Sequence, residues 1–65
     1  PEGVSGKLLY NMGSSYASLE LFQDAVKCFI QAIDRGLDDN DRALCKKQLS
    51  RCKILAKEQA RRASR

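Results

Sequence analysis

Apolar residues recur every three or four positions along most of this 65-residue chain, and that is the period of an α-helix. Three stretches carry the pattern: residues 6–19, 22–35 and 38–62. We therefore expect an all-α fold, in which the first two helices form an antiparallel hairpin and the third helix covers it. The expected segments are a lead-in (1–5), the helix pair (6–37), a C-terminal capping helix (38–62) and a frayed basic tail (63–65).

Local signals mark the expected helix ends. Ser5 is a fair N-cap, because its hydroxyl can accept a hydrogen bond from a free N–H of the first turn. Gly36 should end the second helix in the left-handed conformation, which suits a glycine placed just past the last turn. The third helix should begin among Asp38, Asp39, Asn40 and Asp41, because acidic residues favour the positive end of the helix dipole.

Each expected helix has a packed face. On the first helix it comprises Leu8 or Leu9, Met12, Gly13, Tyr16 and Leu19, and on the second Phe22, Ala25, Val26, Phe29, Ile30, Ala32 and Ile33. The second stripe is too wide for one neighbouring helix to cover. We expect the third helix to cover the rest with Leu44, Cys45, Leu49, Cys52, Leu55 and Ala56.

Small and aromatic residues alternate in the hairpin at a characteristic spacing: Gly13, Tyr16, Phe22, Ala25, Phe29 and Ala32. A small residue on one helix leaves room for a ring from the other. The run resembles a tetratricopeptide repeat (TPR), an antiparallel helix pair of about 34 residues. It departs at Leu9, where a tryptophan is common, and at Leu37, where a proline usually closes the unit. Since such solenoids need roughly three repeats, the resemblance implies the C-terminal end of a longer array.

The charges divide between the two halves of the chain. Residues 1–41 carry three basic and seven acidic side chains, a net charge of −4, whereas residues 42–65 carry nine basic and one acidic, a net charge of +8. The basic surface of the third helix includes Arg42, Lys46, Lys47, Arg51 and Lys53. It permits an alternative function, contact with nucleic acid or anionic lipid. Because no aromatic residue follows Phe29, the helix offers no platform for stacking bases, which argues against nucleic acid.

The residue types argue against catalysis. The chain has no histidine and no glycine-rich phosphate loop, so we expect no enzyme, cofactor or metal site. Cys45 and Cys52 would lie about 10.5 Å apart along one helix, too far for a disulfide, while Cys28 could approach one of them. We interpret all three cysteines as small apolar core residues.

The resemblance to TPR proteins implies a protein–protein interaction module. In that family the first helices line a concave groove that binds extended peptides, which would assign Lys7, Tyr10, Asn11, Ser14 and Ser18 to the partner-binding face. The third helix resembles the closing helix of cochaperones and large immunophilins, which hold the acidic C-terminal tail of a chaperone with a carboxylate clamp. Lys7 or Asn11 can match one clamp position, depending on the repeat that is aligned, but neither alignment completes the clamp.

Three further expectations concern the chain as a whole. Uncovered apolar surface would make self-association a second alternative, in which the chain is an oligomerisation unit. The sequence Arg61-Arg62-Ala63-Ser64 resembles a basophilic kinase site, with Ser64 as the phosphorylated residue. The odd number of cysteines, together with the lack of a membrane span or a leader pattern, favours a cytoplasmic location, with the nucleus as the other option.

Overall fold

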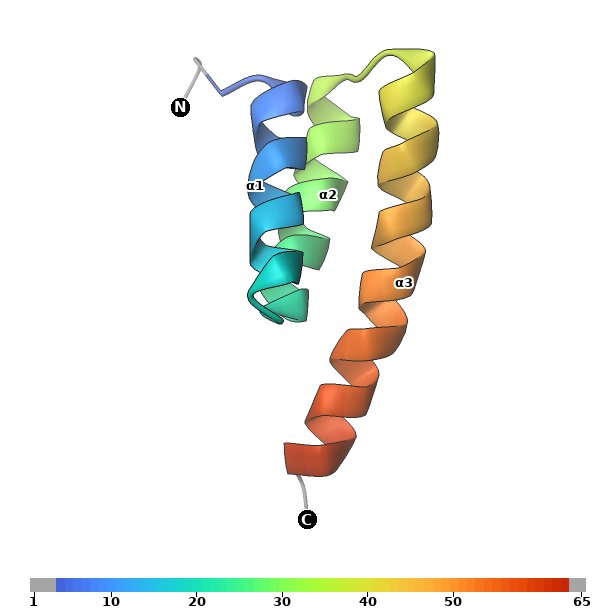
Figure 1. The fold of residues 1–65 in the computed structure, drawn as a ribbon. Coiled ribbons are helices and arrows are strands. Elements are labelled where there is room, and N and C mark those ends of the chain that lie inside the picture. The colour runs from blue at the N-terminus through green and yellow to red at the C-terminus, as the bar shows by residue number, and fades with distance from the viewer. Residues whose placement is uncertain (1–3, 64–65) are drawn as a thin grey trace.

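The structure is a computed structural model that describes residues 4–63, and this part of the chain consists of three α-helices (Figure 1). They are α1 (Gly6–Ser18), α2 (Phe22–Arg35) and α3 (Asp39–Ala63). The all-α prediction is confirmed, and the predicted bounds of α2 are those observed. Helix α1 ends one residue earlier than expected, and α3 ends one residue later.

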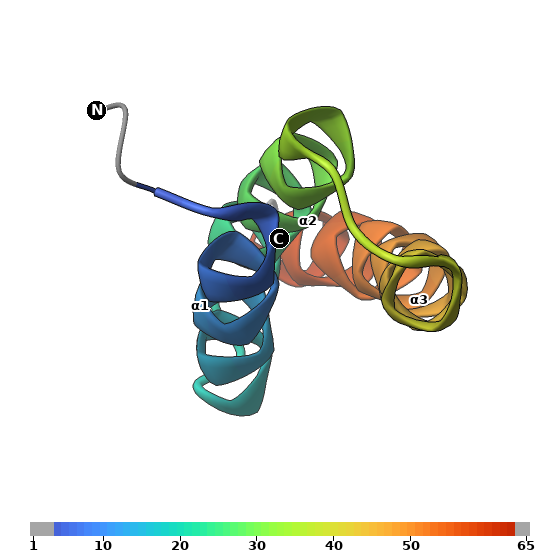
Figure 2. The same ribbon diagram turned by 90° about the horizontal axis from the view of Figure 1, so that it is seen from above.

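The central helix is α2. It runs antiparallel to α1, and α3 then returns in the direction of α1 (Figure 1). Seen from above, α1 and α3 lie on either side of α2 (Figure 2). The three helices form a V with α2 at its apex, and the open side of the V lies between α1 and α3. Packing is extensive between α1 and α2 and between α2 and α3, but sparse between α1 and α3. The surface between α1 and α3, on the side away from α2, is therefore left uncovered.

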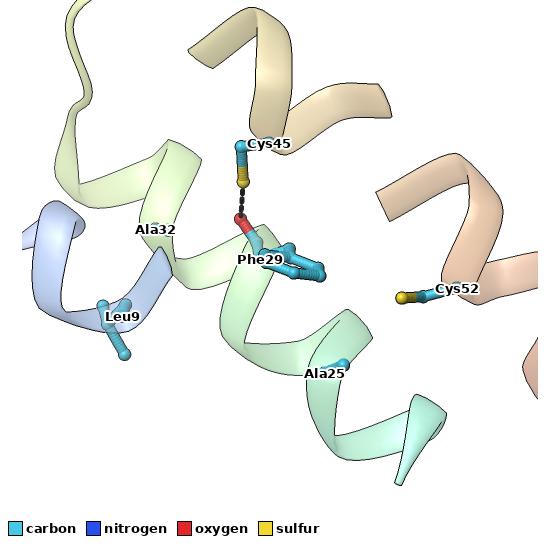
Figure 3. Packing of buried hydrophobic residues seen from close by; sticks show 6 residues of the cluster. All are labelled: Leu9, Ala25, Phe29, Ala32, Cys45 and Cys52. Atoms are coloured by element: carbon cyan, nitrogen blue, oxygen red, sulfur yellow. Dashed lines mark hydrogen bonds between the residues drawn. The ribbon is translucent and has the colours of Figure 1, made fainter. Parts of the chain in front are cut away.

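The core is centred on Phe29 of α2, which is fully buried (Figure 3). Its buried neighbours in the core cluster are Leu9, Ala25, Ala32, Cys45 and Cys52. A Cβ atom added to Gly13 would lie 2.6 Å from the Phe29 ring, which confirms that a small residue on one helix makes room for a ring from the other. The cysteines of α3 cover the opposite side of the core, as expected.

Some of the residues expected in the packed faces are exposed. On α1, Met12 and Leu19 are 39% and 68% exposed, and of the two candidate leucines Leu9 is buried while Leu8 is not. Met12 lies at the edge of the contact between α1 and α2, where it lines a groove with Leu9 and Gln31, and Leu19 lies just past the end of α1, at its C-cap. Ile30 and Leu44, each 49% exposed, lie at the edges of the apolar stripes of α2 and α3 in the same way.

The helix caps follow the local sequence closely. The Leu8 N–H donates to the Ser5 hydroxyl at 3.1 Å, and the Asp41 N–H donates to the Asp38 carboxylate at 2.8 Å. Gly36 has the positive φ of +115° that a glycine tolerates, but its ψ of 130° is not that of the left-handed helix. The chain therefore leaves α2 in an extended direction, and α3 begins three residues later.

The turn between α1 and α2 closes without a glycine. The Leu21 N–H donates to the Tyr16 carbonyl at 2.9 Å, and the Glu20 N–H donates to the Ala17 carbonyl at 3.0 Å, which is the Schellman pattern at a helix C-terminus. This pattern requires a left-handed residue, and Glu20 supplies it with a φ of 62°. A side chain at this position costs free energy, because its Cβ approaches the backbone.

Glu20→Gly is expected to raise the free energy of unfolding by about 1 kcal/mol, because glycine adopts the left-handed conformation without that cost. Urea denaturation followed by circular dichroism measures the change. Glu20→Ala is the matched control, since it removes the same carboxylate but keeps the Cβ atom. Equal stability of the two variants would contradict the backbone explanation.

Candidate functional site

A groove lies between α1 and α3, on the side that α2 leaves uncovered, and encloses a volume of about 360 Å³. Its lining comprises Ser14, Ala17 and Ser18 of α1, Phe22 of α2, and Gln48, Arg51, Cys52 and Leu55 of α3. The arrangement follows from helical periodicity, because residues three or four positions apart share a face of their helix. Helices α1 and α3 run in the same direction (Figure 1), and one such row from each helix lines the groove.

The lining combines an apolar surface with groups that form hydrogen bonds. Phe22, Leu55 and the buried Cys52 supply the apolar part. The hydroxyls of the two serines and the amide of Gln48 can each donate and accept hydrogen bonds. The guanidinium of the exposed Arg51 adds a positive charge with a planar array of donors. This surface could accommodate an apolar side chain, peptide groups and a carboxylate at once.

Two polar contacts join α3 to the helix hairpin. The Lys7 ammonium at the start of α1 donates to the Asp41 carboxylate of α3 at 2.9 Å. At the other end, the Gln59 side-chain amide donates to the Glu20 carbonyl at 2.7 Å. These contacts span 34 and 39 residues of sequence, so they connect α3 to distant parts of the hairpin.

The ammonium of Lys7 is occupied by its contact with Asp41. The hydrogen bond to Asp41, and its negative charge, raise the pKa of the Lys7 ammonium above the ordinary value. The same ammonium lies 5.9 Å from the centre of the Tyr10 ring. A ligand carboxylate at this place would compete with Asp41 for Lys7, which makes Lys7 a poor clamp residue in this conformation.

The other residues predicted for the partner-binding face have separate positions. Ser14 and Ser18 line the groove. Tyr10 is half-buried and packs on the core, with its ring 5.8 Å from that of Phe29, so it is not a free contact residue. Asn11 is exposed one turn before Ser14, outside the lining of the groove.

The residues predicted as one basic surface are spread around α3. Arg51 points into the groove with α1, whereas Lys53 lines a second groove between α2 and α3. Arg42 donates to the Asp39 carboxylate at 2.7 Å, and Lys46 and Lys47 are exposed elsewhere on the helix. The positive charge is therefore divided between different sides of α3. The predicted phosphorylation site, Ser64, lies outside the described residues.

The three cysteines are free, buried thiols. Burial raises the pKa of each thiol above its ordinary value, and the charge of Asp24 raises that of Cys28 further. The Cys45 thiol donates to the Phe29 carbonyl at 3.5 Å (Figure 3). A raised pKa keeps a thiol protonated and unreactive, so the cysteines act as small core residues. Within residues 4–63, no three His, Cys, Asp or Glu side chains come together as a metal site would require.

Sequence reasoning missed the part of the groove that α2 and α3 contribute. Gln48 belongs to none of the predicted faces, and the sequence predicts Phe22, Cys52 and Leu55 only as packed residues of the helices. The spacing of Gln48, Arg51 and Leu55 places them on one face of a helix. This spacing predicts the groove only if the face of α3 that carries these residues is known to lie beside Ser14 and Ser18.

The assignment to the TPR family stays a prediction. A hairpin with a third helix is an arrangement that many helical proteins share, so it does not identify a family. In the described part of the chain, no helix combines the length and the apolar character needed to cross a membrane. No protein-family model matches the chain, and neither a curated protein nor a solved structure is significantly similar to it.

Proposed function

We propose that the chain is a TPR-like protein–protein interaction module that binds an extended peptide in the groove between α1 and α3. The observation that carries this proposal is the composition of the groove, where hydrogen-bonding side chains and an exposed cation surround an apolar surface. A peptide presents the matching groups, because it combines backbone donors and acceptors with side chains of either character.

The groove is preorganised for such a ligand. Both walls are already in place in the free chain, because α1 and α3 each pack on α2 and the Lys7–Asp41 and Gln59–Glu20 contacts tie α3 to the hairpin. Preorganised walls reduce the conformational entropy that binding would otherwise lose. The two serines are small enough to let a peptide backbone approach α1 closely.

Arg51 is the residue we assign to a ligand carboxylate. Its guanidinium makes no ion pair within residues 4–63, whereas Lys7 is bound to Asp41. Arginine is also the better partner for a carboxylate, because its two parallel N–H groups match the two oxygens. The proposed ligand is therefore an acidic peptide, and an acidic C-terminal tail of a chaperone belongs to this class.

Arg51→Gln is expected to weaken binding of an acidic peptide by about tenfold, because a charged hydrogen bond is lost. Fluorescence anisotropy with labelled GSGEELD, carrying a free C-terminal carboxylate, measures the affinity. Lys46→Gln is the matched control, since it removes one positive charge from an exposed position of α3 that neither lines the groove nor lies one helical turn from Arg51. Equal losses in the two variants would indicate nonspecific attraction to a basic helix and would contradict the assignment of the groove.

A further inference from the structure

A second groove lies on the other side of α3, between α3 and α2, and encloses about 310 Å³. Its lining comprises Gln23, Val26 and Lys27 of α2 and Lys53, Ala56 and Lys57 of α3. It shares no residue with the groove between α1 and α3. Any ligand of this second groove would therefore bind independently of the peptide discussed above.

The charge of this groove is entirely positive. Lys27 stands on the α2 wall, and Lys53 and Lys57 stand one helical turn apart on the α3 wall. All three side chains are exposed, and none forms an ion pair within the described residues 4–63. By contrast, Lys7 and Arg42 do have carboxylate partners. Three ammonium groups around one groove give it a positive potential, which an anionic partner would complement.

The floor of the groove is apolar and recessed. It is formed by Val26 and Ala56, which are half-buried, while the lysines stand at the rim. A lipid bilayer contacts apolar residues that protrude from a surface, and these do not protrude. Nucleic acid would use the lysines, but it would leave the apolar floor without a partner, because no aromatic residue is present for base stacking.

We propose that the groove between α2 and α3 binds an acidic segment of a partner protein, in which carboxylates flank an apolar side chain. The apolar side chain occupies the floor over Val26 and Ala56. The carboxylates on either side pair with Lys27 on one wall and with Lys53 and Lys57 on the other. This surface goes beyond the proposed function, since it would give the chain a second, outward-facing contact with a protein.

A labelled, acetylated and amidated peptide, EELEELEE, is a suitable probe, because it carries apolar residues flanked by carboxylates and has no charged terminus. Lys27→Glu and Lys53→Glu are each expected to weaken its binding about fivefold to tenfold, measured by fluorescence anisotropy at low salt. Lys47→Glu, an equal charge change at an exposed residue of α3 that does not line this groove, is the matched control and should have little effect. All three positions are exposed, so the variants should fold.

Two further measurements separate this proposal from its alternatives. The peptide EESEESEE has the same charge but no apolar anchor, and it should bind several-fold more weakly. An amide-resolved NMR titration with EELEELEE should shift the amides of Lys27, Lys53 and Lys57, which line only this groove, so failure here is distinguishable from failure of the groove between α1 and α3. Equal affinity for the serine peptide, equal losses in all three lysine variants, or preferential binding to vesicles of phosphatidylcholine and phosphatidylserine would each overturn the proposal.

Discussion

Phe29→Ala is expected to lower the free energy of unfolding by about 3–5 kcal/mol. Phe29 is the largest of the fully buried side chains, and it contacts the residues that hold all three helices together. Removing its ring leaves a cavity that Gly13 cannot fill and that lies between the helices. A domain of this length has a total stability of about 3–10 kcal/mol, so the variant should be largely unfolded at 37 °C.

Thermal and urea denaturation, followed by circular dichroism at 222 nm, measure this loss. Ile30→Ala is the matched control, because Ile30 is the next residue of α2 but is 49% exposed. It should cost about 1 kcal/mol or less. Similar losses in the two variants would show that the core is not centred on Phe29.

Gly6→Ala should also be strongly destabilising, with a cost of about 1–3 kcal/mol. Helix propensity alone predicts the opposite sign, because alanine is favoured over glycine within a helix by about 0.5–1 kcal/mol. A Cβ atom at Gly6 would, however, lie against the Gly36 carbonyl oxygen and 2.8 Å from that of Ala32. Both obstacles are backbone atoms at the end of α2, so neither can rotate away.

The same denaturation experiments test this sign. Ser15→Ala provides the comparison, because Ser15 is exposed on α1 and its replacement should change stability only slightly and favourably. A Gly6→Ala variant that is as stable as the parent chain would mean that the start of α1 does not approach the end of α2 this closely.

Local sequence signals predicted the elements of this fold. Ser5 and Asp38 cap their helices, and Gly36 ends α2 at a positive φ, because each effect depends on residues within one helical turn. The complementarity of Gly13 and Phe29 was also readable, since small and large residues alternate at helical spacing. The exposure of Met12 and Leu19 was not, because periodicity alone does not say which part of a wide apolar stripe a neighbouring helix will cover.

Half of the candidate groove escaped prediction for a related reason. Ser14 and Ser18 were expected from the resemblance to TPR proteins, but the wall that α3 provides depends on how α3 is oriented relative to α1. That orientation is fixed in part by the Lys7–Asp41 and Gln59–Glu20 contacts. Each contact joins residues more than 30 positions apart, and no pattern within a single helix predicts which distant residues will meet.

The central claim is that an acidic peptide binds between α1 and α3, and an amide-resolved NMR titration tests it most directly. The probe is GSGEELD with a free C-terminus, compared with the same peptide carrying a C-terminal amide. We predict shifts at Ser14, Ser18, Gln48 and Arg51 that weaken on amidation, because one carboxylate is lost. Shifts confined to Lys27, Lys53 and Lys57, or no shifts at all, would contradict the assignment of this groove as the peptide site.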